Sequence, residues 1–304
     1  MLSAREVGLV AQREILRNIR STKGIAMFAL FFLGGLVPAV VRLLISKLTD
    51  DVPEEILRRG FEKYLSTRYD DAVAKHVVDA PSILYFLYEG TVMFLPLLVL
   101  LVGFDQIAGE VQHRTIRYSA GRATRPSIVA GKALGIWGVV AIMISVLHLT
   151  VWLVTLAQGG TGAGAVFGWG IRFTLFSIVC AAAYVGFTSL MSSLFRTPTV
   201  SLFAGAGAGF ALWLSYTLMR GLVGLAERVD EAIKAGTPGA ADAWQPPAGL
   251  VKVIDSFTWL YPNRYERLLV SPDPLSLVTG LGLFVLWGSV CVAIASFIVS
   301  RRDV

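Results

Sequence analysis

The chain has 304 residues, of which 55% are hydrophobic and 16% are charged, and its mean hydropathy is +0.66. Soluble domains carry about a quarter charged residues, so this composition excludes an ordinary soluble domain. The net charge of +6 arises from basic residues in short segments beside apolar runs, which argues against a nucleic-acid partner. Cys180 and Cys291 both lie inside apolar runs without metal-ligand spacing, so we expect neither a disulfide framework nor a metal site.

The apolar residues are gathered into six long runs, and runs of about 18 or more residues with few charges indicate membrane-spanning helices. We therefore predict an all-α integral membrane protein with six spans and a single transmembrane domain over residues 1–304. The first run begins after Lys23 and is longer than the apolar region of a signal peptide, so we expect an uncleaved span. The predicted spans are 24–45, 83–104, 133–157, 171–194, 199–220 and 275–299.

Basic residues are distributed unevenly between the segments that join these spans. Residues 1–23 and 105–132 hold five Lys or Arg each, whereas acids outnumber bases in 46–82 and 226–274. The positive-inside rule therefore predicts that both termini and residues 105–132 are cytoplasmic. We expect a multi-pass protein of the inner cell membrane. Residues 46–82 and 226–274 become the outer loops.

Both outer loops carry signals of folded structure. In the first, Glu54 and Glu55 precede Arg58 and Arg59 by four residues, a spacing that favours a helix. The second contains aromatic residues typical of a belt at the membrane surface. A surface for an external accessory protein is the other interpretation of these loops. The aromatic residues are Trp259, Tyr261 and Tyr265.

Two glycine-containing stretches look like nucleotide-binding motifs but lack the required context. The sequence GAGAGF at 205–210 lies within an apolar run, without the strand and acidic residue of a dinucleotide-binding unit. A phosphate-binding loop would need glycine at Pro126 and a hydroxyl at Ala133. We therefore expect no enzyme activity and no cofactor in this chain.

Small residues recur every four positions in the fifth predicted span. This spacing places them on one helix face, where they allow another helix to approach closely. We predict that this face packs against another helix. The residues are Ser201, Gly205 and Gly209.

His148 and Glu89 are ionisable residues within predicted spans, where such groups often serve function. His148 is in the third span and either lines a pathway or forms a hydrogen bond between helices. Glu89, near the outer end of the second span, either lines a pathway or reaches solvent. The sequence leaves both alternatives open.

The segment DQIAGEVQHRTIRYSAGRATRPSIVAGK, residues 105–132, is a polar stretch between two spans. Glu110 and Arg114 stand four residues apart, so we predict a short helix over 105–120 in which they pair. Gly121 would end this helix, and Pro126 would lie in the first turn of the next one. We thus predict a folded hairpin rather than a loose loop.

This segment resembles the region between spans two and three in the permease subunits of type-2 ABC transporters, the ABC-2 family. That family has an acidic residue near the membrane, a Glu shortly after it, a Thr–Ile or Thr–Leu pair, an Arg–Pro turn and a Gly–Lys entering the third span. Family members often have Gly before the Thr, where this chain has Arg114. The matching positions are Asp105, Glu110, Thr115–Ile116, Arg125–Pro126 and Gly131–Lys132.

The resemblance implies a permease subunit without a nucleotide site. Two copies, expected as a homodimer, would form the pathway, and a separate ATPase subunit that binds ATP and Mg would drive transport, by resemblance export. The alternative is an ATP-independent channel or secondary transporter, which would need buried ionisable pairs or broken helices at mid-membrane. The residues that the resemblance assigns to ATPase coupling are Asp105, Glu110, Arg114, Thr115, Arg117, Arg125, Pro126 and Lys132.

Overall fold

The computed structural model describes the whole chain except residues 1–2, 49–53, 116–122, 160–161, 237–245 and 303–304. Every regular element in the described part is a helix, which confirms the predicted all-α class. The helices are α1 (Ala4–Arg20), α2 (Thr22–Leu48), α3 (Glu54–Ser66), α4 (Asp71–Val77), α5 (Ser82–Gly103), α6 (Ala108–Gln112), α8 (Arg125–Gln158), α9 (Ala163–Leu194), α10 (Pro198–Lys234), α11 (Ala248–Thr258), α12 (Pro262–Leu269) and α13 (Pro274–Arg301).

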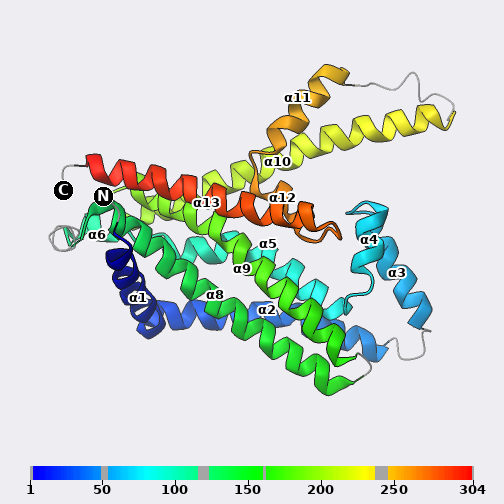
Figure 1. Cartoon of the computed structure of the whole chain (residues 1–304), viewed down its shortest axis with the longest axis horizontal. Helices are drawn as coiled ribbons and strands as arrows, with labels where there is room; N and C mark the ends of the chain where they lie inside the picture. Colours follow the sequence, from blue (N-terminus) through cyan, green and yellow to red (C-terminus); the bar gives the residue numbers. More distant parts are fainter. Residues whose placement is uncertain (1–2, 49–53, 116–122, 160–161, 237–245, 303–304) are drawn as a thin grey trace.

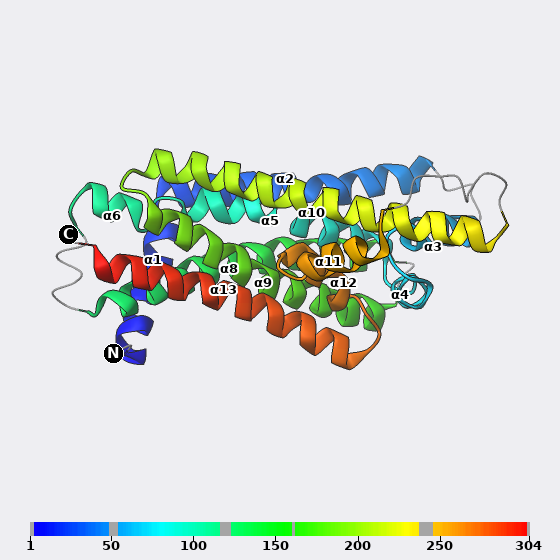
Figure 2. The same ribbon diagram turned by 90° about the horizontal axis from the view of Figure 1, so that it is seen from above.

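The long helices form an elongated bundle (Figures 1 and 2). Helix α9 packs against α5, α8 and α13, and α2 packs against α5. Helix α6 lies at the end of the bundle where both termini are found, which we call the terminal end. Helices α3 and α4 lie at the opposite end, which we call the loop end.

Five helices of the described chain are long and apolar enough to cross a membrane: α5, α8, α9, α10 and α13. Helices α1 and α2 meet at a bend of 73° and together give a sixth candidate span. Several helices are longer than the apolar runs predicted. Helix α9 already begins at Ala163, and α10 continues through polar residues to Lys234. Apolar runs mark where hydrocarbon is crossed, whereas backbone hydrogen bonding continues into polar sequence.

The bend between α1 and α2 has a local cause. The Ser21 hydroxyl donates a hydrogen bond to the Asn18 carbonyl, and Ser21 Oγ also accepts one from the Gly24 N–H. A side chain at position 24 would overlap the Asn18 carbonyl, so glycine is needed for the tight turn. The bend separates α1, which carries Arg and Glu, from the apolar α2.

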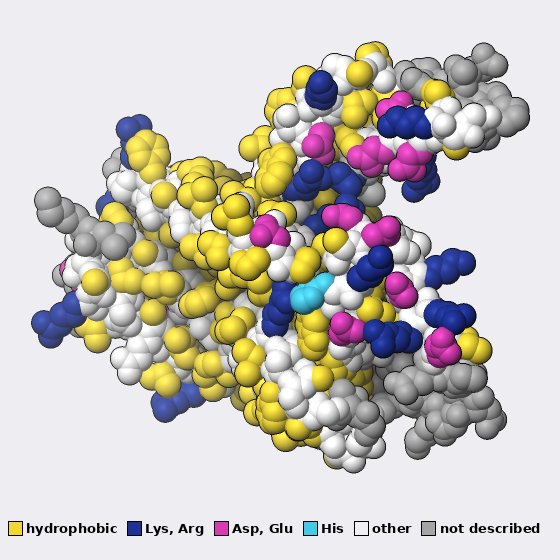
Figure 3. All heavy atoms as spheres, turned by 45° about the vertical axis from the view of Figure 1, so that its right-hand side comes forward, with side chains coloured by type: hydrophobic (Ala, Val, Ile, Leu, Met, Phe, Trp, Pro, Cys, Tyr) yellow, Lys and Arg dark blue, Asp and Glu magenta, His cyan; other side chains and the backbone are white. Residues whose placement is uncertain are grey.

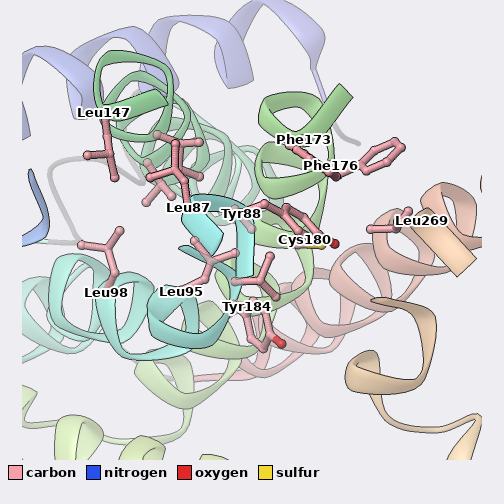
Figure 4. Packing of buried hydrophobic residues seen from close by; sticks show 14 of the residues in the cluster. Leu87, Tyr88, Leu95, Leu98, Leu147, Phe173, Phe176, Cys180, Tyr184 and Leu269 are labelled. Atoms are coloured by element: carbon pink, nitrogen blue, oxygen red, sulfur yellow. The ribbon is translucent and has the colours of Figure 1, made fainter. Parts of the chain in front are cut away.

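The core fills the space between α5, α8, α9 and α13. Leu87 and Tyr88 of α5 pack beside Phe173 and Cys180 of α9 (Figure 4). The rings of Tyr88 and Phe173 stack with centroids 5.0 Å apart. These contacts fix the relative rotation of the helices and therefore the positions of polar groups at their ends.

Helix α10 is the least enclosed candidate span. Only 6% of its most apolar window is buried within this chain. Phe203 and Phe210 are largely exposed, as expected of side chains that face lipid or another protein. Beyond the bundle α10 continues into an arm with α11 (Figure 1).

Candidate coupling site

A buried lysine lies at the centre of the polar contacts near the terminal end. Lys132 Nζ lies 2.8 Å from Glu110 Oε1 and 3.5 Å from Glu14 Oε2. The side chain of Lys132 is only 4% exposed. An uncompensated charge at such a site would be costly, so the two carboxylates are needed to hold the ammonium ion there.

Helix α1 supplies the second half of this charge cluster. Glu14 is as deeply buried as Lys132, and Arg17 donates to Glu14 Oε1 at 2.6 Å. Arg17 also approaches Glu110 Oε1, at 4.0 Å. Two acids and two bases therefore form one group, the charge cluster, which joins α1, α6 and α8.

Glycines on α8 allow α1 to come close enough for these contacts. A Cβ at Gly131 or Gly135 would crowd α1, where the nearest atoms belong to Val10 and Glu14. Gly138 continues the same face and lies against Ile15. The signal for this contact was present in the sequence as a small-residue repeat at four-residue spacing. The packing face predicted from sequence lay on the fifth span alone, so this contact between α1 and α8 was not predicted.

The start of α6 is fixed to the C-terminal end of α9 by serine side chains. Ser192 Oγ accepts hydrogen bonds from the backbone N–H groups of Ile107 and Ala108, at 3.0 and 3.1 Å. Its hydroxyl donates to the Phe104 carbonyl at 2.9 Å. Gln106 donates to Ser189 Oγ at 2.8 Å. The free N–H groups at a helix start are thus satisfied by a neighbouring helix.

Asp105 ties the end of α5 to the start of α2. Lys23 Nζ lies 2.7 Å from Asp105 Oδ1 and also donates to the Val102 carbonyl at 3.0 Å. The same ammonium group lies 4.2 Å from the centroid of the Phe104 ring. Residues 105–112 are therefore attached to α1, α2, α8 and α9 by polar side chains.

The predicted helix over 105–120 is wrong in extent, since α6 ends at Gln112. The predicted pairing of Glu110 with Arg114 is also replaced, because Glu110 turns to Lys132 and Arg17. A buried ammonium gains more from a carboxylate than an exposed guanidinium does. Arg114 and Thr115 are exposed. Arg117 lies outside the described residues.

Arg114 has a φ of 55°, in the left-handed region that favours glycine. The family resemblance places a glycine at this position in many permeases. The turn after α6 thus gives a physical reason for that preference. Here an arginine occupies the turn and presents a positive charge at its surface.

Arg125 and Pro126 lie at the start of α8, ahead of the third predicted span at 133–157. Pro126 is in the first turn of α8, as predicted. Arg125 donates to the carbonyls of Ser300 and Arg302 at 3.0 and 2.8 Å, which satisfies the end of α13. Arg125 is therefore a link to the C-terminal helix within this chain.

The sequence model of the ABC-2 family transporter protein matches residues 9–304. The chain belongs to this family. By its family and its apolar helices, the protein is a multi-pass membrane permease of an ABC transporter. No curated protein matches it significantly.

His148 and Glu89 of this ABC-2 permease both have partners within the chain. His148 is buried, with Nε2 3.1 Å from Thr91 Oγ1 and Nδ1 2.9 Å from Thr174 Oγ1. It therefore joins α5, α8 and α9, which fits a hydrogen bond between helices. Glu89 accepts from Tyr64 and forms an ion pair with Arg68, so it meets the 46–82 segment.

The small-residue face of α10 packs inside this ABC-2 permease. Ser201 and Gly205 are buried, and a Cβ at Gly205 would lie 2.7 Å from Leu100 Cδ1 of α5. Gly209 is looser, because its Cβ would lie 3.8 Å from Phe187 of α9. The face predicted for helix packing therefore contacts α5 and α9.

Proposed function

We propose that this permease exports its substrate when a separate ATPase subunit, which binds ATP and Mg, docks on the terminal end. The observation that carries the proposal is the attachment of residues 105–112 to α1, α2, α8 and α9 by polar contacts. In this proposal the terminal end is cytoplasmic, and two copies of the chain form the pathway across the inner membrane.

The exposed turn after α6 is the surface offered to the ATPase. His113, Arg114 and Thr115 are all exposed there. The positive charge of Arg114 would suit an acidic group on the partner, and such charge pairs guide association. The neighbouring Glu110 faces inward and serves to hold the turn in place.

The charge cluster would transmit the movement of this turn. Separating Lys132 from Glu110 would leave buried charge uncompensated, which typically costs about 3–5 kcal/mol. A push on α6 is therefore expected to carry α1 and α8 with it rather than break the contact. Ser192 would pass the same movement to α9. A rigid connection of this kind is what domain motion requires.

A pull-down experiment tests the docking surface. The tagged permease is purified from its native membrane, and the ATPase that co-purifies is identified by mass spectrometry and quantified. Arg114→Glu should lose the ATPase, while Lys63→Glu, an exposed reversal in α3 at the loop end, should retain it. Equal retention in both variants, or no ATPase with the unaltered permease, would count against the proposal.

A further inference from the structure

An apolar cavity of about 350 Å³ lies between α5, α9 and α10 and extends to the start of α12. This volume is within the range of about 300–1,000 Å³ that is usual for small-molecule sites. Aromatic side chains dominate its wall. They are Tyr184, Phe187, Phe210, Trp213, Tyr261 and Trp287.

Small residues on α10 leave the space that forms the cavity. Ala206 and Gly209 of α10 leave space opposite Pro96 and Leu97 of α5. Leu97 is 53% exposed and Phe210 is 61% exposed, so the rim of the cavity faces outward from the bundle. In a span this direction is the lipid hydrocarbon, from which an alkyl chain could enter without crossing water.

Arg264, Arg267 and Arg220 lie on α12 and α10, two of the helices that line the cavity, beyond the lining residues themselves. Helix α12 starts at the cavity wall with Pro262 and continues with Arg264 and Arg267. Arg264 and Arg220 of α10 share one carboxylate, Asp255, at 3.3 and 3.7 Å. Figure 3 shows basic side chains gathered at the base of the arm, beside a hollow in the surface. One acid thus faces two of these guanidinium groups.

The acidic residue of α12, Glu266, compensates the charge of the arginines only in part. Glu266 Oε1 accepts from the hydroxyl of Tyr184, a residue of the cavity wall, at 3.5 Å. Desolvation by burial raises the pKa of the Glu266 carboxyl to about 7. Near neutral pH the three arginines therefore outweigh Asp255 and a partly protonated Glu266.

We propose that this cavity binds the hydrocarbon chain of an anionic amphiphile, whose acidic head group lies at Arg264 and Arg267. The apolar wall recognises the chain, and the guanidinium groups recognise the charge because arginine forms strong charge-assisted hydrogen bonds with carboxylate and phosphate. Binding needs no ATPase subunit, so this inference stands apart from the docking proposal above.

The test uses the purified permease in phosphatidylcholine nanodiscs. The probe is 11-(dansylamino)undecanoic acid, an anionic single-chain amphiphile, and its methyl ester is the uncharged counterpart. Binding is followed by energy transfer from the tryptophans of the permease to the probe, and two of them, Trp213 and Trp287, line the cavity. The acid should bind at least about tenfold more tightly than the ester, since charge-assisted hydrogen bonds are roughly twice as strong as neutral ones.

Variants separate the head-group contact from the chain contact. Arg264→Gln with Arg267→Gln should weaken binding of the acid about tenfold and leave the ester unchanged, as expected for the loss of charge-assisted bonds. Asp255 keeps Arg220 as its partner in this variant. Ala206→Phe, which fills the cavity, should weaken both probes. Arg301→Gln, an exposed change at the terminal end, is the matched control and should bind as the unaltered protein does.

Competition experiments distinguish a membrane lipid from a single-chain solute as the anionic amphiphile that binds. Displacement of the probe by phosphatidylglycerol in the nanodisc identifies a membrane lipid, and displacement only by dodecyl phosphate identifies a single-chain solute. Either result supports the site. Equal binding of acid and ester, or wild-type binding by Ala206→Phe, would overturn it.

Discussion

The ammonium group of Lys132 lies 2.8 Å from the carboxylate of Glu110, and this contact joins α6 to α8. Glu14 completes the arrangement from α1. Residues 105–112, between α5 and the turn after α6, are consequently attached to the helix bundle by side-chain contacts and do not form a loose loop.

Lys132→Met should destabilise the permease by about 3–5 kcal/mol, because it leaves Glu110 and Glu14 buried without their ammonium partner. The measurement is the fraction of protein that remains monodisperse after heating in detergent. The triple variant with Glu110→Gln and Glu14→Gln should recover part of the loss, since it removes the charge of both carboxylates that lost Lys132. Wild-type heat resistance of Lys132→Met would show that the cluster contributes little.

Glu110→Ala and Arg114→Ala should behave differently, although the two residues are neighbours in sequence. Glu110→Ala leaves Lys132 with only the 3.5 Å contact to Glu14, so heat resistance should fall. Arg114→Ala removes an exposed charge, and its effect on stability should stay within about 0.5 kcal/mol. The same heating measurement compares them. Equal losses would imply that Arg114 also has a structural partner.

Gly205→Leu should be more harmful than Gly209→Leu. The first places a side chain where Leu100 Cδ1 lies 2.7 Å from the Cβ position, and overpacking of this kind costs about 1–3 kcal/mol. The second meets Phe187 only at 3.8 Å. Thermal unfolding followed by tryptophan fluorescence provides the comparison, and the reverse order would mean that α10 shifts easily.

The contact between α4 and α9 should weaken in acid. Arg172 donates to His76 Nε2 at 2.7 Å, which requires a neutral imidazole. Burial, and then the charge of Arg172, lower the pKa of His76 below its ordinary 6.5. The unfolded state therefore binds the proton more readily, and the stabilisation present above about pH 6.5 is lost as pH falls.

Hydrogen exchange in α4 measures this effect between pH 7.5 and 5. Protection, corrected for the intrinsic exchange rate, should drop as pH falls in the unaltered protein. In His76→Phe, which cannot be protonated, it should stay constant. A drop of the same size in both proteins would show that His76 is not the source of the pH dependence.

The proposed orientation predicts a labelling pattern. A cysteine at Ser66, the end of α3, should react with an impermeant reagent in intact cells. A cysteine at Thr115, after α6, should react only after permeabilisation. Reaction of Thr115→Cys in intact cells would reverse the orientation and remove the basis for ATPase docking at that end.

The sequence by itself determined the class, the spans and the place of the polar segment. Lipid offers no hydrogen bonds, so an apolar run of sufficient length must become a helix whatever its neighbours are. Pro126 could likewise be assigned to the first turn of α8 from local chemistry, because proline fits the start of a helix.

Only the tertiary structure decided which polar groups meet. The spacing of Glu110 and Arg114 favoured a pair within one helix, but helix packing brought Lys132 nearer to Glu110. His148 likewise found Thr91 and Thr174 on two other helices. Such partners depend on how each helix is rotated and how far it is shifted along its neighbours. Those two quantities are set by contacts between distant segments, and no local pattern in the chain contains them.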